Sequence, residues 1–559
     1  MSREEQIPVW MLIGILLVTL LWGGGNTLYE SFGLGVLVTF LLLFLVWKQR
    51  NLRLYVGRIW IPIALLFVGS ILALFTTTSH GMAFLGLMQM MVPAALAVVW
   101  MQLEKKQQEV VLWMIPWSGA AITVMSAIGY FIPPLQGLLF TLDRMRGPFP
   151  YANVCGLYMM IGLLLLFYLQ EEKKVTLRFG CLFVALFAGV LFSGCRSVFV
   201  LTVLSLIYAV IRYRTMRTVI LVEGGVLLTA GLGYVFITGD TTGVGRFVTT
   251  SLHSATLAER IICWRDGWSV FLAHPLGLGY KGFTMMENAV QTGPYAVQYV
   301  HNDWLQMALD HGFLGFFGFL GLFAWAVWKQ KGIKRWILLM LAIHFFVDFS
   351  LQYTLIAGIL LFLFPWELLP EKRIAARGIM TGMFVVLCGC FLWLGIADGL
   401  RKAGDYKASL QVYPWNWQVR MFDLAEDTTA ETVPERVEAL LRQNPWNPTA
   451  YNAWSIYYAQ QENYTFAIDK AKVAVKYHRY DMASYDNLIL FYGRGIESCR
   501  SQGNLKLAEK WQAELGEIYT QWQMLQQEQD VLSNRIAKED AYKLSDLSTE
   551  ILEYYGILH

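Results

Sequence analysis

The sequence predicts an all-α protein: a polytopic transmembrane helical bundle of about 13 spans over residues 1–398, then a helical-repeat domain over residues 399–559. Three observations predict this organisation. Of the 559 residues, 56% are hydrophobic and only 15% charged, which is too apolar for a soluble protein of this size. Apolar windows recur from Val9 to about Ala397. From about Arg401 the chain becomes charged and aromatic, with no apolar run long enough to span.

The apolar windows have roughly the length that a helix needs to cross about 30 Å of hydrocarbon. We expect the first one to remain as an anchor, because residues 23–26 lack a convincing small-x-small cleavage site and another window follows closely. The windows are 9–24, 31–47, 59–75, 82–101, 110–132, 153–169, 178–193, 197–211, 218–237, 304–328, 335–349, 352–369 and 378–397.

Every second joint between these windows is basic, and short basic loops stay in the cytoplasm. The joints 24–30, 76–81 and 350–351 contain no Lys or Arg. We therefore expect a multi-pass protein of the cytoplasmic membrane, with its N-terminus inside and its C-terminal region outside. The basic joints contain Lys48, Arg50, Arg53 and Arg58; Lys105 and Lys106; Lys173, Lys174 and Arg178; Arg212, Arg214 and Arg217; Lys329, Lys331, Lys334 and Arg335; and Lys372, Arg373 and Arg377.

Net charge and cysteine content exclude some classes of function. The net charge of +3 is accounted for by the basic joints, so it gives no reason to expect a nucleic-acid partner. The seven cysteines lack the spacing of metal ligands. We expect neither a disulfide nor a bound metal.

A short motif repeats in the C-terminal region. Pro-Trp-Asn at 414–416 recurs at 445–447, a period of about 31 residues. The region resembles degenerate tetratricopeptide repeats, although Ser455 and Ala471 depart from that pattern. We expect the aromatics to form the core of a solenoid capped by the helical stretch from Leu505 to Ile536; a concave surface for a glycan or a partner protein is the alternative. The matching large and small positions are Tyr451, Trp454, Tyr458, Ala467 and Ala474.

Few cations fall in the joints expected outside. Arg196 lies in a joint so short that its guanidinium must stay near the membrane, where a charge normally pairs or faces a cavity. It could instead anchor to lipid phosphates, and Arg246 and Arg265 are better candidates for that role. The outer cations are Arg144, Arg146, Arg196, Arg246, Arg260, Arg265 and Lys281.

The outer loop 238–303 ends at a histidine. An amphipathic stretch from Leu257 to Ala273 is expected to lie along the interface, and the proline and glycines of 274–280 then turn the chain back. His301 directly precedes a helix, whose positive end disfavours imidazolium and leaves a neutral ring able to act as a general base. As alternatives, His301 pairs only with Asp303 or backbone, and Asn302 merely caps the helix.

Several short motifs lie between residues 144 and 315, within a stretch from about 10 to 365 that resembles the O-antigen ligase and O-antigen polymerase superfamily. A looser match runs from Arg146 to Asn153 at the start of the sixth window, although Asn153 could equally cap that helix. The closer matches are Arg196 after an apolar span, Arg260-x-x-x-Trp264, His274-Pro-Leu-Gly-Leu-Gly, His301-Asn302 and Gly312-x-x-Gly315.

The resemblance implies a GT-C type glycosyltransferase that transfers a glycan from undecaprenyl diphosphate to an acceptor hydroxyl at the outer face, with inversion and without a metal or other cofactor. It implies that Arg196 and Arg260 bind the diphosphate and that His301 assists the acceptor, which is a glycan, a lipid or a protein. The other residues expected to contact substrate are Arg146, Asn153, Arg265 and Asn302.

Two other functions are open at this point. A polysaccharide transporter or exporter subunit with a docking solenoid would need buried acidic residues, for which Asp348 and Glu223 are the main candidates. We see no convincing inverted repeat. An outer scaffold whose repeats recruit an envelope protein would not need so many spans.

Overall fold

The structure, a computed structural model, describes residues 3–171, 173–239, 244–247, 254–426, 431–527, 530–537 and 542–558. Helices dominate it. Those up to the last apolar window are α1 (Arg3–Leu21), α2 (Leu28–Gln49), α3 (Trp60–Thr76), α4 (His80–Gln102), α5 (Lys105–Gly129), α6 (Pro133–Leu139), α7 (Ala152–Gln170), α8 (Leu177–Ser193), α9 (Arg196–Arg212), α10 (Arg217–Thr238), α11 (Ala255–Ala273), α12 (Gly282–Val290), α13 (Asp303–Lys329), α14 (Gly332–His344), α15 (Thr354–Phe362) and α16 (Ile379–Lys402).

A helix lies in every predicted apolar window. In the described part of the chain, 7 helices are long and apolar enough to cross a membrane, namely α2, α4, α5, α7, α10, α13 and α16. Four shorter apolar helices add to them, at Gln6–Leu21, Trp60–Thr76, Leu177–Ser193 and Thr354–Leu368. The expectation of a multi-span helical membrane protein is therefore confirmed, while the number of about 13 spans stays a prediction.

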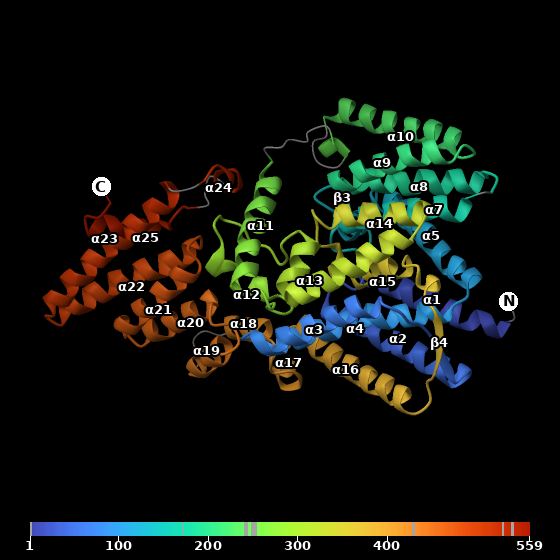
Figure 1. Cartoon of the computed structure of the whole chain (residues 1–559). Helices are drawn as coiled ribbons and strands as arrows, with labels where there is room; N and C mark the ends of the chain where they lie inside the picture. Colours follow the sequence, from blue (N-terminus) through green and yellow to red (C-terminus); the bar gives the residue numbers. More distant parts are fainter. Residues whose placement is uncertain are drawn as a thin grey trace.

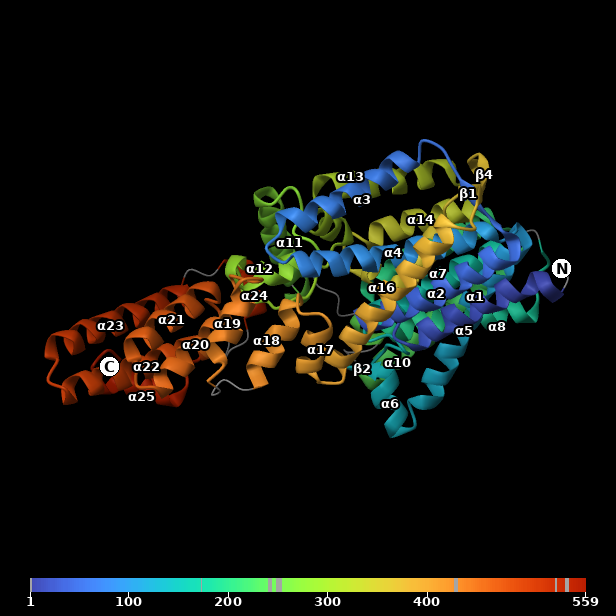
Figure 2. The same cartoon turned by 90° about the horizontal axis from the view of Figure 1, so that it is seen from below.

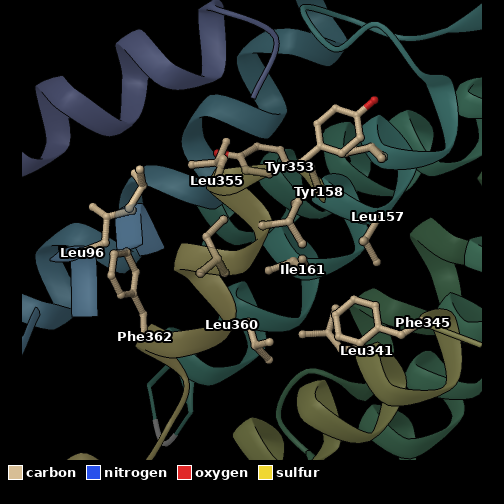
Figure 3. Close-up of a cluster of buried hydrophobic side chains, with 14 of the residues drawn as sticks. Leu96, Leu157, Tyr158, Ile161, Leu341, Phe345, Tyr353, Leu355, Leu360 and Phe362 are labelled. Atoms are coloured by element: carbon tan, nitrogen blue, oxygen red, sulfur yellow. The ribbon is translucent and has the colours of Figure 1, made fainter. Parts of the chain in front are cut away.

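The bundle is built around α7. Its apolar window is 94% buried, against 11% for α10 and 17% for α16, so α7 is central and the other two lie at the edge. It packs against α5, α8, α9 and α14. The buried core around it includes Leu96 of α4, Ile161 of α7, Leu341 of α14 and Leu360 of α15, which belong to one hydrophobic cluster (Figure 3). Packing of these apolar faces holds the helices that carry the site.

Two short antiparallel sheets depart from the all-α expectation. β1 (Asn51–Tyr55) pairs with β4 (Glu371–Ala375), and β2 (Phe140–Thr141) pairs with β3 (Arg144–Met145). The first sheet joins two basic joints predicted to share one side of the membrane, and Glu371 offsets some of their charge through an ion pair of 3.6 Å with Arg53. These two joints therefore do lie side by side. In the described part of the chain the remaining elements are three 3₁₀ turns: η1 (Val244–Phe247), η2 (Ser350–Gln352) and η3 (Trp366–Leu368).

Helix α13 is broken at Gly312, whose φ of 66° and ψ of −172° are accessible essentially only to glycine. The motif at 274–279 fills the break with backbone hydrogen bonds. Leu278 N donates to Leu309 O at 2.8 Å, and Phe313 N donates to Pro275 O at 2.8 Å. The expected tight turn thus binds to the backbone of α13 on both sides of Gly312, which attaches the outer loop to this helix.

The C-terminal region extends from one end of the bundle, and the N-terminus lies at the opposite end (Figures 1 and 2). Consecutive helices α20, α21, α22 and α23 pack against one another. Their assignment to tetratricopeptide repeats stays a prediction. These helices are α17 (Tyr406–Val412), α18 (Trp417–Glu426), α19 (Val433–Leu441), α20 (Pro448–Gln460), α21 (Tyr464–Tyr477), α22 (Met482–Ser501), α23 (Leu505–Gln527), α24 (Val531–Ile536) and α25 (Asp546–Tyr554).

The C-terminal region is joined to the bundle by packing as well as by the chain. One continuous set of buried apolar side chains runs from Val9 to Ala453, and a second runs from Ala459 to Tyr555. The predicted stretch from Leu505 to Ile536 is not one capping helix: α23 packs on α22, whereas α24 packs on α11 of the outer loop. The division at residue 398 stays a prediction, and that residue lies inside α16.

We predict that Gly312→Ala destabilises the protein by about 1–3 kcal/mol or more, because the new side chain needs a glycine-only conformation. A Cβ there would also lie 2.4 Å from the backbone carbon of Leu276. The apparent midpoint of thermal unfolding in detergent should fall by several degrees. Gly225→Ala is the matched control, since nothing lies within 4 Å of its Cβ position. Equal midpoints for the two variants would contradict this account of the break.

Candidate active site

The site is organised around Asp348, a carboxylate with no exposed side-chain surface in the connection after α14. Asn153 Nδ2, from the first turn of α7, donates to Asp348 Oδ2 at 2.7 Å. Arg260 Nη2, on α11, lies 3.8 Å from the same oxygen. His301 Nδ1, just before α13, lies 3.6 Å from Oδ1. Three segments far apart in sequence therefore converge on one buried charge.

The surroundings keep this carboxylate ionised. Burial raises the pKa of Asp348, but the interactions with His301 and the Arg260 guanidinium more than offset it, so the pKa lies well below its usual range. Its backbone is fixed as well, because Asp303 N donates to the carbonyls of Phe345 and Asp348 at 2.7 and 3.1 Å. The first residue of α13 thus fixes the backbone of residues 345–348, which carry the carboxylate.

His301 occupies a strained position. Its φ of 50° is uncommon for a residue other than glycine, and Trp264 Nε1 of α11 donates to its carbonyl at 3.3 Å. The Nδ1–Asp348 distance of 3.6 Å makes this an electrostatic contact rather than a hydrogen bond. A carboxylate on that side favours the tautomer with hydrogen on Nδ1. Nε2 is then an acceptor, and no hydrogen bond to it is found among the described residues.

Three aromatic rings pack beside Asp348 and His301. Phe349, next to Asp348, stacks with Tyr151 and Tyr299 at centroid distances of 5.1 and 5.3 Å. The His301 ring meets Phe349 edge to face at 4.9 Å. These contacts limit how far the imidazole can turn away from the carboxylate.

Positive charge also gathers around this cluster. Arg144 of β3 donates from Nη2 to Asn153 Oδ1 and from Nε to Ser193 O at 2.9 Å. Arg196, the first residue of α9, donates to Thr256 Oγ1 at 3.0 Å and feels the charges of Arg246 and Arg260. Burial lowers the pKa of Arg144, and repulsion from Arg246 lowers it further, against the opposing effect of Cys195. Such a concentration of like charge favours binding of a polyanion.

Four of the seven predicted site residues come together here: Arg260, His301 and Asn153 contact Asp348, and Arg196 is coupled to Arg260 through its charge. The other three make different contacts. Arg146 donates to the carbonyl of Gly137 at 3.3 Å, Asn302 caps α13 by accepting from Leu305 N at 3.0 Å, and Arg265 forms an ion pair of 2.8 Å with Asp530.

Two residues of the cluster were missed as site residues. The sequence places Arg144 only among the outer cations and Asp348 only among the ion-relay candidates, inside a window that reaches residue 349. Helix α14 in fact ends at His344. The available signal was an isolated Asp in an apolar segment beside an outer joint. Within the described ranges, no group of three or more His, Cys, Asp or Glu side chains could hold a metal ion.

Residues 181–320 match the family model described as O-antigen ligase. No curated protein matches the chain. The matched segment includes Arg196, Arg260 and His301, whereas Asn153 and Asp348 lie outside it. The chain is therefore a multi-span helical membrane protein that carries an O-antigen ligase domain.

A second buried acid supports the loop that leads to His301. Glu287 of α12 accepts from Val297 N at 2.6 Å. Burial raises the pKa of Glu287 to about 8, although the hydrogen bond from Val297 acts against this. The folded state therefore holds a proton that the unfolded chain releases near its ordinary pKa of 4.5.

We predict that this proton makes stability depend on pH. Its stabilisation is fully present below pH 4.5 and is lost as pH rises through about 8, because the folded pKa is the higher one. Glu287→Gln keeps the carbonyl oxygen that accepts from Val297 N but cannot ionise, so the variant should lose this dependence. Unfolding midpoints of both proteins, measured from pH 5 to about 9, test it, and parallel curves would contradict it.

Proposed function

We propose that the protein transfers a glycan from undecaprenyl diphosphate to an acceptor hydroxyl at the outer face of the cytoplasmic membrane, as a step of surface polysaccharide biosynthesis. The O-antigen ligase domain supports lipid-linked glycan transfer in that process. The observation that carries the proposal further is the meeting of Arg260 and His301 at Asp348, beside further arginines. The set combines an anion site with a proton acceptor.

The arginines suit the donor's diphosphate. A guanidinium can hold two phosphate oxygens at once, and its charge stabilises the negative charge that grows on the leaving diphosphate. Arg260 is charged but already shared with Asp348, and burial, which lowers its pKa, is more than offset by Asp348 and Tyr151. Arg196 and Arg144 provide positive charge that one carboxylate does not neutralise. A diphosphate would relieve this repulsion.

His301 suits the acceptor. The acceptor oxygen attacks the anomeric carbon while the bond from that carbon to the diphosphate breaks, which inverts the configuration. Nε2 of His301 takes the hydroxyl proton, and Asp348 stabilises the imidazolium that forms. The proton then passes to solvent, and the diphosphate leaves with its charge held by the guanidiniums. This step uses arginine charge where other enzymes use a metal ion.

The same contacts weigh against a transporter. Asp348, one of the two ion-relay candidates, is held by Arg260, Asn153 and His301 in the connection after α14. Its local role in the cluster accounts for its burial. The acceptor, whether a glycan, a lipid or a protein, would decide between polymerase, ligase and protein O-oligosaccharyltransferase activity on this one site.

We further propose that the N-terminus is cytoplasmic and that the tetratricopeptide-like region 399–559 lies outside. The charge alternation supports this orientation. The separation of the two ends of the molecule is compatible with it (Figure 1). Tyr413 OH donates to the carbonyl of Gly81 at 2.7 Å, so the C-terminal region contacts a joint predicted to be outer.

We predict that Arg196→Ala, Arg260→Ala and His301→Ala each reduce glycan transfer by about a hundredfold or more, because each removes charge stabilisation or the proton acceptor. Transfer from a purified lipid-linked donor to candidate acceptors is the measurement, with membrane levels of each variant as the check on folding. Arg217→Ala, on a joint predicted to be cytoplasmic, is the control. Full transfer by all three variants would rule out the proposed site.

We predict that Asp348→Asn lowers transfer by about tenfold to a hundredfold while donor binding changes less, since an amide can occupy the same space but no longer favours hydrogen on Nδ1. Comparing the rate at saturating donor with the donor concentration for half-maximal rate separates the two effects. If only the latter changed, Asp348 would serve the diphosphate through Arg260 and not His301.

A further inference from the structure

Helix α11 contacts both the active site and the C-terminal region within little more than one turn. Arg260 reaches Asp348 at 3.8 Å, and Trp264 donates to the His301 carbonyl at 3.3 Å. The next residue, Arg265, forms an ion pair of 2.8 Å with Asp530, 265 positions away in the sequence. With a rise of about 1.5 Å per residue, any shift of Arg265 along the helix axis moves the other two side chains with it.

In the C-terminal region, Asp530 and its neighbour Ser533 make further hydrogen bonds that support this contact. Asp530 caps α24 by accepting from Ser533 N at 2.7 Å, so its carboxylate is oriented before it meets Arg265. Burial raises the pKa of Asp530, but Arg265 and Ser533 more than offset it and bring the pKa to about 2. The Ser533 hydroxyl donates to the carbonyl of Thr292 at 3.2 Å, and Arg265 Nη2 donates to the hydroxyl of the same threonine.

Two parts of the C-terminal region contact the outer loop at residues 291 and 292. Arg479, between α21 and α22, donates to the carbonyl of Gln291 at 3.2 Å, next to the threonine that α24 contacts. On α11 itself, Asp266 accepts from Thr292 N at 2.7 Å. The threonine therefore links α24, the loop and α11.

We propose that the C-terminal region positions the catalytic helix: the Arg265–Asp530 pair holds α11 so that Arg260 meets the donor diphosphate while Trp264 keeps its hydrogen bond to the His301 carbonyl. Arg265 is then a positioning residue and does not bind phosphate itself. The inference rests on the proposed function, because it takes the diphosphate as the ligand. Residues 530–537 then affect the active site through α11, without contacting the substrate themselves.

The expected effect is modest. Both side chains of the pair are nearly half exposed, at 45% and 41%, and such ion pairs contribute little on their own. We therefore expect a change of a few fold in donor binding and not its loss. A cycle of single and double variants can resolve an effect of this size.

The test measures binding of undecaprenyl diphosphate to the full chain in lipid nanodiscs. Arg265→Gln and Asp530→Asn remove the charges, and asparagine still caps α24. Each should weaken binding by about threefold to fivefold, and the double variant should be no weaker than the singles. Glu509→Gln, an exposed carboxylate change on α23, should bind like the wild type.

Three outcomes would overturn the proposal. If Arg265→Gln weakens binding and Asp530→Asn does not, Arg265 contacts the diphosphate directly. If the two changes add in the double variant, they act independently. If neither changes binding, the pair does not position α11.

Backbone hydrogen exchange in α11 gives a readout that does not need the ligand. Asp530→Asn should speed exchange around residues 262–270, whereas Glu509→Gln should not. If wild-type protein failed to bind undecaprenyl diphosphate, the proposed function would fail. The exchange experiment would still show whether the C-terminal region holds α11. Unchanged exchange would contradict the proposal that the Arg265–Asp530 pair holds this helix.

Discussion

A carboxylate buried among apolar helices needs partners, because an isolated charge in that environment costs several kcal/mol. Asp348 has no exposed side-chain surface and obtains its partners from α7, α11 and the residue His301 just before α13. The need for partners therefore constrains how these three segments are placed relative to one another. The carboxylate also favours one tautomer of His301. Nδ1 faces Asp348 and carries the hydrogen, so Nε2 is the acceptor nitrogen of the ring.

Backbone hydrogen bonds impose a second constraint on the same region. In a membrane the amides and carbonyls freed by a helix break must find other partners. The break at Gly312 finds them in residues 275–279. A Cβ at Gly312 would meet the backbone of Leu276, and a Cβ at Gly277 would meet the backbone of residues 310–312. The outer loop is therefore attached to α13 by its backbone, and α11 is carried into contact with Asp348 by the same loop.

Several arginines of the described residues lie close enough to act on one another's charge. Arg144, Arg196, Arg246 and Arg260 influence one another, while Asp348 is the carboxylate that the cluster shares. Repulsion among cations that are held in place by the fold is a form of preorganisation, because the proposed diphosphate would meet the charge without having to assemble it. The C-terminal region adds to this by fixing the helix that carries Arg260.

The sequence by itself determined the positions of the helices, the basic and neutral joints, and the identity of Arg196, Arg260 and His301 as candidates, because these depend on local apolar length, charge and residue type. Only the tertiary structure decided their partners. Asp348 meets Asn153 across 195 positions and Arg265 meets Asp530 across 265, and no local pattern encodes such contacts. Asn302 shows the same limit at short range. Its side chain satisfies a free amide at the start of α13, a use that the residue type permits and that only the helix geometry selects.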